Sequence, residues 1–329
     1  MQMIRNILVV GGGGYIGSHT TLALKEAGYG TVVYDNLSSG HRDACFGDHL
    51  VEGDLADTGR LARALEEFDI ACVIHFAALI EAGQSVIDPL PFFQNNVAGT
   101  LSLLEAMRRA RGTRLVFSST AAVYGNQAQT PLLAEDLPRS PINPYGDSKA
   151  MVERIFESCV PAYGLQAIAL RYFNAAGADA QGRSGERHDP ETHLIPLVIE
   201  AAQGTRAQIK INGTDYDTPD GTCIRDYIHV TDLALGHVAA VTHLLAQDAA
   251  GFQPVNLGTG TGRSVREVIA AVKNISGRDF KVVEDVRRPG DPARLVADAR
   301  RAGTLLGWNA QYSDLEAIVR DAWAFAERG

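Results

Sequence analysis

Four consecutive glycines follow a short apolar strand near the start of the chain, and they constrain its fold more than any other feature. The strand is predicted at residues 7–10, and the glycines occupy 11–14, with another at 17. Helical spacing follows to about residue 27, and a second apolar strand at 31–34 ends at Asp35. Glycines here permit a tight turn and let a pyrophosphate approach the helix N-terminus. The order predicts a dinucleotide-binding Rossmann unit, although a glycine-rich turn without ligand has the same local sequence.

Acidic side chains at strand ends indicate which dinucleotide is bound. Asp35 is placed to bond the ribose hydroxyls of the adenosine, and its charge repels a 2′-phosphate. We therefore expect NAD rather than NADP. Asp54 follows another short apolar stretch at 50–51. Its carboxylate is either an acceptor for the adenine amine or part of an ordinary turn.

Strands and helices alternate through the first half of the chain. Strands are predicted at 71–76, 114–117 and 166–171, and helices at 95–110 and 144–163. Such alternation indicates an α/β fold with a doubly wound, parallel Rossmann sheet, whose strands all end at the edge where ligands bind.

The pattern becomes irregular after about residue 174. Regular elements return near 227–230, in a helix to about 245 and at 254–257, separated by loops that include 178–193 and 215–222. We predict a Rossmann NAD-binding domain at 1–175, to which the chain returns around 226–258. A smaller C-terminal α/β domain at 176–329 would cover the nucleotide edge and hold the substrate.

Composition excludes several classes of protein. The formal net charge is −9 and the pI about 5.5, which argues against a nucleic-acid partner. No apolar run approaches the roughly 18 residues of a membrane span, and the chain opens directly into a strand, so we expect no signal peptide and no membrane partner. The four cysteines are scattered and the nine histidines occur singly. We therefore expect reduced thiols, a cytoplasmic location and no metal site.

Tyr145 and Lys149 lie four residues apart in the helix predicted at 144–163. Side chains at this spacing leave the same face of a helix. A lysine ammonium about 5 Å from the phenol, at an effective dielectric of about 20, would favour the phenolate by roughly 3 kcal/mol, or about two pKa units. The pair can then do acid–base work beside a dinucleotide, although a surface tyrosine and lysine at helical spacing are common.

Hydroxyl side chains end the strand predicted at 114–117. They belong to Ser118, Ser119 and Thr120, and one of them can hold a substrate oxygen beside Tyr145. We choose Thr120 for this role. Solvation of the strand end is the alternative explanation.

Small side chains end the strand predicted at 71–76. Phe76 is followed by Ala77 and Ala78. These alanines leave room for a ribose or a nicotinamide, and plain core packing is the alternative explanation.

Together these motifs resemble the extended short-chain dehydrogenase/reductase superfamily and, within it, the UDP-glucose 4-epimerase family. The superfamily resemblance rests on Gly11-x-x-Gly14-x-x-Gly17, the Ser-Ser-Thr strand end and Tyr145-x-x-x-Lys149. The resemblance to the epimerases runs nearly end to end. Its most specific stretch is Arg-Asp-Tyr-Ile-His-Val at 225–230, with a Gly-Thr lead at 221–222.

The resemblance implies an isomerase with tightly bound NAD, and it assigns residues to three groups. The catalytic group would be Thr120, Tyr145 and Lys149. NAD would contact Gly11, Gly14, Tyr15, Ile16, Gly17, Asp35, Asn36, Asp54, Leu55, Phe76, Ala77, Ala78, Asn95 and Phe173. The UDP-sugar would contact Tyr172, Asn174, His193, Leu194, Ile211, Asn212, Arg225, Arg288 and Asp291. Two arginines suit a diphosphate, because guanidinium groups form bidentate, charge-assisted bonds.

The chain departs from the family pattern at four of its positions. Ile80 stands where the family often has a lysine, so a cationic contact to the cofactor ribose is missing or made elsewhere. Asn212 replaces a common aromatic residue beside the uracil, and His193 replaces an asparagine. Leu295 is intermediate in size between the tyrosine and the smaller residues of relatives, which leaves acceptance of N-acetylated sugars open.

The resemblance implies interconversion of UDP-galactose and UDP-glucose through a transient 4-keto sugar. A 4-epimerase of UDP-N-acetylglucosamine, UDP-xylose or UDP-glucuronate is the main alternative. Dehydratases and decarboxylases of the superfamily usually carry an acid after the strand-end hydroxyl, where this chain has Ala121 and Ala122. Non-catalytic NAD sensors typically lose the tyrosine or the lysine. A homodimer is also implied, with the helices from about 95 and about 144 forming a four-helix contact.

Overall fold

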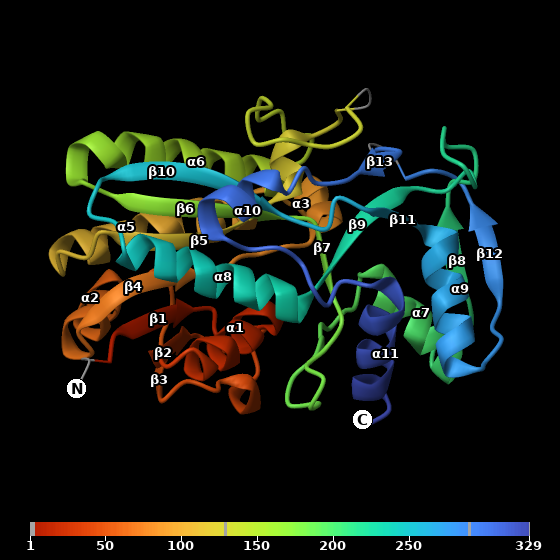
Figure 1. Ribbon diagram of the computed structural model, residues 1–329, viewed down its shortest axis with the longest axis horizontal. Coiled ribbons are helices and arrows are strands. Elements are labelled where there is room, and N and C mark those ends of the chain that lie inside the picture. Colours follow the sequence, from red (N-terminus) through yellow and green to blue (C-terminus); the bar gives the residue numbers. More distant parts are fainter. Residues whose placement is uncertain (1–3, 128–129, 289–290, 329) are drawn as a thin grey trace.

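A parallel seven-stranded sheet forms the centre of the larger part of the molecule (Figure 1). The computed structural model describes residues 4–127, 130–288 and 291–328. The strand order is β10-β6-β5-β4-β1-β2-β3. The strands are β1 (Asn6–Val10), β2 (Gly30–Asp35), β3 (His49–Glu52), β4 (Ile70–His75), β5 (Arg114–Thr120), β6 (Gln166–Tyr172) and β10 (Gly251–Leu257). Every neighbouring pair is parallel, which confirms the predicted doubly wound Rossmann sheet.

Helices cover both faces of this sheet. The helices α2 (Thr58–Glu67), α5 (Gly99–Arg109) and α6 (Pro144–Tyr163) pack on one face, around Leu61, Leu103 and Phe156. The helices α1 (Tyr15–Glu26), α8 (Val230–Leu245) and α10 (Arg300–Leu306) pack on the other, around Val241 and Ala302. The sheet is therefore buried on both sides, which explains why its strands are continuously apolar.

A smaller part, drawn at the right of Figure 1, has its own apolar core. It contains α7 (Leu194–Gln203), α9 (Val265–Ser276), α11 (Leu315–Ala326), β8 (Ile209–Asn212) and β12 (Val282–Asp285). A small sheet of β7 (Asn174–Ala176), β9 (Ile224–His229), β11 (Gly262–Ser264) and β13 (Arg294–Leu295) has β9 at its centre. The chain returns to the large sheet for α8 and β10, as expected, and again for α10, which the sequence pattern did not indicate. The limits of the two domains stay a prediction.

The helix predicted at 95–110 begins earlier than expected and is interrupted. Its first turn is α4 (Leu90–Phe92), a wide π-helical segment follows at Phe93–Ala98, and α5 completes it. Wide turns of this kind occur mostly at functional sites. Here the turn brings Asn96 against the loop after β4, where its amide accepts from the Leu79 N–H at 2.8 Å and donates to the Leu79 carbonyl at 3.0 Å.

The start of α6 is set by local sequence. The Asn143 side chain accepts a hydrogen bond from the Gly146 N–H at 2.8 Å, and Pro144 occupies the first turn. A Cβ on Gly146 would lie only 2.7 Å from the carbonyl oxygen of Ala122. The glycine therefore lets α6 approach the short helix Ala121–Tyr124 after β5, so that Tyr145 comes close to Thr120.

Among the described residues, no helix combines the length and the apolar character needed to cross a bilayer. All four cysteines have free thiols, in agreement with the expectation from their spacing.

A buried ion pair ties α6 to β6. Arg171 and Glu153 approach to 2.5 Å, and their side chains are 3% and 0% exposed. Glu153 also accepts from the Ser119 hydroxyl at 2.6 Å. Removing one partner of a buried pair leaves a charge without compensation in a medium of low dielectric.

We predict that Arg171→Met lowers the free energy of unfolding by about 3–5 kcal/mol, measured by urea denaturation. Arg139→Met is the matched control, because Arg139 reaches the same Glu153 at 3.4 Å with a side chain that is 21% exposed. We expect the control to lose about 1 kcal/mol or less. Equal losses in the two variants would contradict the assignment.

Candidate active site

A cavity of about 350 Å³ lies at the carboxyl edge of the large sheet. Residues at or just beyond the ends of five strands line it: Val10 of β1, Asp35 of β2, Phe76 after β4, Thr120 of β5 and Tyr172 of β6. Strand ends of an open parallel sheet are where ligands of such folds bind.

The structure brings most of the predicted residues to this cavity. Its walls contain Gly11, Gly14, Tyr15, Ile16, Gly17, Asp35, Asn36, Leu55, Phe76, Ala77, Ala78, Asn95, Thr120, Tyr145, Tyr172, Phe173, Asn174 and His193. The other predicted residues do not line it: Asp54, Lys149, Leu194, Ile211, Asn212, Arg225, Arg288 and Asp291.

The glycine loop is shaped for close approach of a phosphate-bearing ligand. A Cβ on Gly17 would lie 2.3 Å from the Gly11 carbonyl oxygen, so the turn admits no side chain there. Gly14 caps α1 without a side-chain hydrogen bond, which leaves the N–H groups of the first turn for a ligand. Asp35 is held at the end of β2 by the N–H groups of Gly13 and Leu37, both at 2.8 Å. This cradle fits the pyrophosphate and ribose of a dinucleotide.

The carboxylate of Asp54 is bonded to nearby groups of the protein, which agrees with the turn that the sequence left open. Its carboxylate accepts from the Asn36 side chain at 2.9 Å and from the Ala56 N–H at 2.9 Å. Both bonds lower the pKa of Asp54. These bonds hold Asp54 in the turn after β3 and position the side chain of Asn36. A contact of Asp54 with adenine stays a prediction.

Tyr145 points its phenol toward Thr120 at the cavity wall. Burial raises the pKa of Tyr145, the hydrogen bond with Thr120 lowers it, and the charge of Glu81 raises it, with a net increase. The predicted lowering of this pKa is therefore wrong for the chain by itself. Desolvation of the phenolate outweighs the favourable terms that the protein supplies.

Lys149 lies behind the cavity and not in its wall. Its side chain is 2% exposed, and its Nζ donates to the Ser118 carbonyl at 2.8 Å. The same Nζ lies 4.8 Å from the centre of the Phe117 ring. Burial lowers the pKa of Lys149 to about 7. Burial thus disfavours the charged form of this amine.

Several predicted substrate residues form a second group around β8 and β9. Arg225 on β9 forms an ion pair with Asp291, and the Asn212 amide, oriented with its oxygen toward Arg288, accepts from that guanidinium at 3.1 Å. Ile211 is 1% exposed in the core of the smaller part, and its contact with a substrate stays a prediction. Leu194 packs against the same core.

The sequence reading missed several cavity residues. They include Ser38, Ser39 and Gly40 after β2, Glu81 after β4, and Glu186 and His188 in the loop before α7. The first three follow Asp35 closely and could have been inferred from it. The last two lie in a loop without periodic pattern, and only their spacing to Glu191 and His193 offered a signal.

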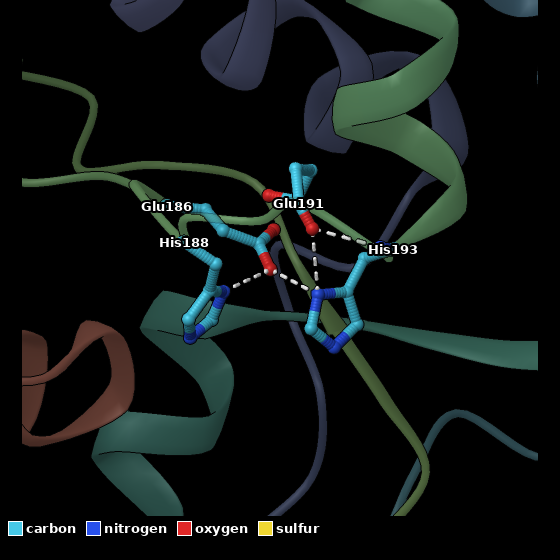
Figure 2. Close-up of side chains that lie close together, drawn as sticks. All are labelled: Glu186, His188, Glu191 and His193. Carbon is cyan, nitrogen blue, oxygen red and sulfur yellow. Dashed lines mark hydrogen bonds and ion pairs between the residues drawn. The ribbon is translucent and has the colours of Figure 1, made fainter. Parts of the chain in front are cut away.

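His193 is held by two carboxylates, and Figure 2 shows the side chains turned toward one another. Its Nδ1 lies 2.8 Å from Glu186 and 2.9 Å from Glu191. Burial opposes a charge on this ring, but the hydrogen bonds with Glu186 and Glu191 outweigh it and raise the pKa of His193 to about 10. The ring therefore presents a positive charge to the cavity at neutral pH.

A family model, described as the NAD dependent epimerase/dehydratase family, matches residues 7–258. The chain belongs to this family. Family membership agrees with the Rossmann sheet and with the glycine cradle described above. It confirms the prediction of an NAD-dependent enzyme.

Relatives of this NAD dependent epimerase/dehydratase chain extend the match to nearly its full length. It is 50% identical over 323 residues to a UDP-glucose 4-epimerase of Rhizobium meliloti (strain 1021), covering 98% of this chain and 97% of the relative. It is similar, with a TM-score of 0.94 and 50% identity, to UDP-glucose 4-epimerase from Brucella ovis in complex with NAD, covering 98% of each chain. The Bifidobacterium longum enzyme in complex with NAD+ and UDP has a TM-score of 0.92 at 36% identity, covering 99% of each chain.

We predict that His193 stabilises the fold only on the acid side of its folded pKa. The pKa rises from 6.5 in the unfolded chain to about 10, so the stabilisation is complete below about pH 6.5 and is lost as the pH rises through about 10. The difference in unfolding free energy between the native chain and His193→Asn should shrink across this window in urea titrations with a chelator present. His49→Asn, on the exposed strand β3, is the control. A difference that stays constant over the window would exclude a charged His193.

Proposed function

We propose that this enzyme interconverts UDP-galactose and UDP-glucose, and that Tyr145 carries the proton. The supporting observation is the phenol of Tyr145, hydrogen-bonded to Thr120, at the wall of a cavity shaped for a dinucleotide. The names of its full-length relatives point to the same reaction. The reaction belongs to galactose metabolism, and we place it in the cytoplasm.

Tyr145 and Thr120 have different roles in the proposed reaction. NAD, when bound along the cavity residues, would supply a reversible hydride acceptor beside the sugar. Tyr145 takes the proton of the 4-hydroxyl and later returns it, while Thr120 holds the same oxygen. Proton transfer by a positioned side chain contributes typically about 10²–10⁴-fold to a rate.

Lys149 orients and tunes this site from behind. Its contact with the Ser118 carbonyl fixes the amine against β5, two residues before Thr120. Because the pKa of Lys149 is about 7, its charged form is available near neutrality and favours the phenolate when present.

For the nucleotide, we propose that NAD lies along the cavity residues named above and that the diphosphate of the sugar nucleotide meets Arg225 and Arg288. Guanidinium forks suit phosphate oxygens. Asp291 holds Arg225 in the ligand-free chain, so it orients this arginine. His193, in the cavity wall itself, adds a positive charge to those of the two arginines.

Elimination chemistry has less support. The positions after Thr120 are Ala121 and Ala122, neither of which can move a proton. Epimerisation of other UDP-sugars stays an alternative, because Leu295 packs in the same small cluster as the cavity residue Phe173. Parallel assays with UDP-galactose and UDP-N-acetylglucosamine separate these substrates.

We also propose a homodimer. The surface of α3 (Ala82–Ile87) and the neighbouring turn exposes Val86, Ile87 and Leu90, and α5 exposes Leu101. Exposed apolar side chains gathered on neighbouring helices are typical of a contact between chains.

We predict that Tyr145→Phe lowers kcat for UDP-galactose by at least about 10²-fold while NAD binding is retained, because only the phenolic oxygen is removed. A coupled assay for UDP-glucose measures the rate, and cofactor absorbance measures the bound NAD. Tyr163→Phe, at the exposed end of the same helix, is the control. Near-native turnover in Tyr145→Phe would remove the assigned base.

We predict that Ile87→Glu converts the dimer to a monomer, because it places a charge in the apolar contact. Sedimentation measures the mass. Leu235→Glu is the control, since Leu235 is exposed on α8 in the opposite helix layer. An unchanged mass for Ile87→Glu would show that this surface is not the contact.

A further inference from the structure

Four potential metal ligands converge in the loop before α7. Glu186, His188, Glu191 and His193 each offer one ligand atom, and these atoms all lie within 4.8 Å of one another. Figure 2 shows His188 and His193 turned toward the carboxylate of Glu186, and Glu191 turned toward His193. The mechanism proposed above uses only His193 of this set, so the convergence needs another explanation.

The spacing of these atoms is close to that of ligands around a small ion. Glu186 lies 3.1 Å from His188 Nδ1 and 2.8 Å from His193 Nδ1, and Glu191 lies 2.9 Å from His193 Nδ1. A tetrahedral zinc ion with ligands at about 2.0–2.2 Å separates them by roughly 3.3–3.6 Å. The three hydrogen-bonded pairs are slightly closer than this, and the other pairs lie within 4.8 Å, so small shifts of the side chains would fit the set around an ion.

The charges of the cluster also favour a cation. Glu186 and Glu191 have side chains only 7% and 8% exposed, and buried carboxylates need compensation. A divalent ion would neutralise both carboxylates, and each histidine would coordinate it in the neutral form.

The surrounding contacts hold the ligands in place. The N–H groups of Thr192 and His193 donate to Glu191 at 2.7 Å each. The His188 ring meets the edge of Tyr15, with centroids 6.4 Å apart. Tyr15 begins α1 and bonds the Gly177 carbonyl at 2.7 Å, at the other end of the loop. Such supporting contacts orient ligands in metal sites.

We propose that Glu186, His188, Glu191 and His193 bind one divalent transition ion of the zinc type. The mixed imidazole and carboxylate set is one that zinc accepts. The ion would clamp the loop against Tyr15 and so stiffen one wall of the cavity. It would use Nδ1 of His193 and leave Nε2 of the same ring free to meet a substrate. The inference does not depend on which sugar nucleotide is turned over.

The test uses the untagged full-length protein, stripped with a chelator and dialysed against zinc chloride. We expect one zinc ion per chain by elemental analysis and a melting temperature that rises with free zinc, because an ion that binds only the folded chain stabilises it. Cobalt(II) in place of zinc should give the intense visible bands of a four-coordinate site, without the charge-transfer band of a thiolate ligand. Enzyme activity is not needed for any of these readouts.

Variants separate this site from adventitious binding. His188→Ala and Glu191→Gln should each weaken zinc binding about tenfold or more, while their urea midpoints in chelator show that they fold. The control is His49→Ala with Glu52→Gln, a histidine and a glutamate on the exposed strand β3, which should bind zinc as the native chain does. The proposal is overturned if the stripped protein takes up no stoichiometric zinc. It is equally overturned if the double variant of His188 and Glu191 keeps native affinity, or if the cobalt spectrum reports thiolate.

Discussion

Parallel pairing of the seven central strands is the constraint on which the rest of the structure depends. Because β1, β2, β4, β5 and β6 all run in one direction, their carboxyl ends meet at a single edge. Residues far apart in the chain, from the glycine loop to Tyr172, thereby line one cavity. The buried pair of Arg171 and Glu153 fixes α6 to the same sheet, and α6 carries Tyr145 to the strand end at Thr120. The position of the phenol follows from this packing.

Electrostatics at the site are governed by burial. The phenol of Tyr145 and the amine of Lys149 each have a pKa shifted toward the neutral form, as expected for charges removed from water. Proton transfer at this site therefore depends on positive charge placed beside the phenol, and bound NAD+ would supply such a charge.

In the loop before α7, the neighbouring charges outweigh burial and favour the charged form of a side chain. Burial also disfavours charge on His193, but two carboxylates at hydrogen-bonding distance outweigh it. The same loop touches Tyr15 at the start of α1 and precedes the helix that opens the smaller part of the molecule. It therefore connects the glycine cradle of α1 with the smaller part of the molecule. The protonation of its four ionisable side chains affects the packing of both.

Sequence by itself determined the α/β class, the glycine cradle with Asp35, the limits of α6 and the identity of the Tyr145–Lys149 pair. These features depend on local patterns: glycines at a turn, apolar strands, an asparagine cap and the spacing of one helical turn. The interrupted helix at Phe93–Ala98, the return of α10 to the large sheet and the place of Asp54 are decided by tertiary contacts. The pKa of Tyr145 is decided there too, because depth of burial is a property of the folded chain. The convergence of Glu186 and His188 with Glu191 and His193 likewise depends on how an irregular loop closes on itself, which no local periodicity encodes.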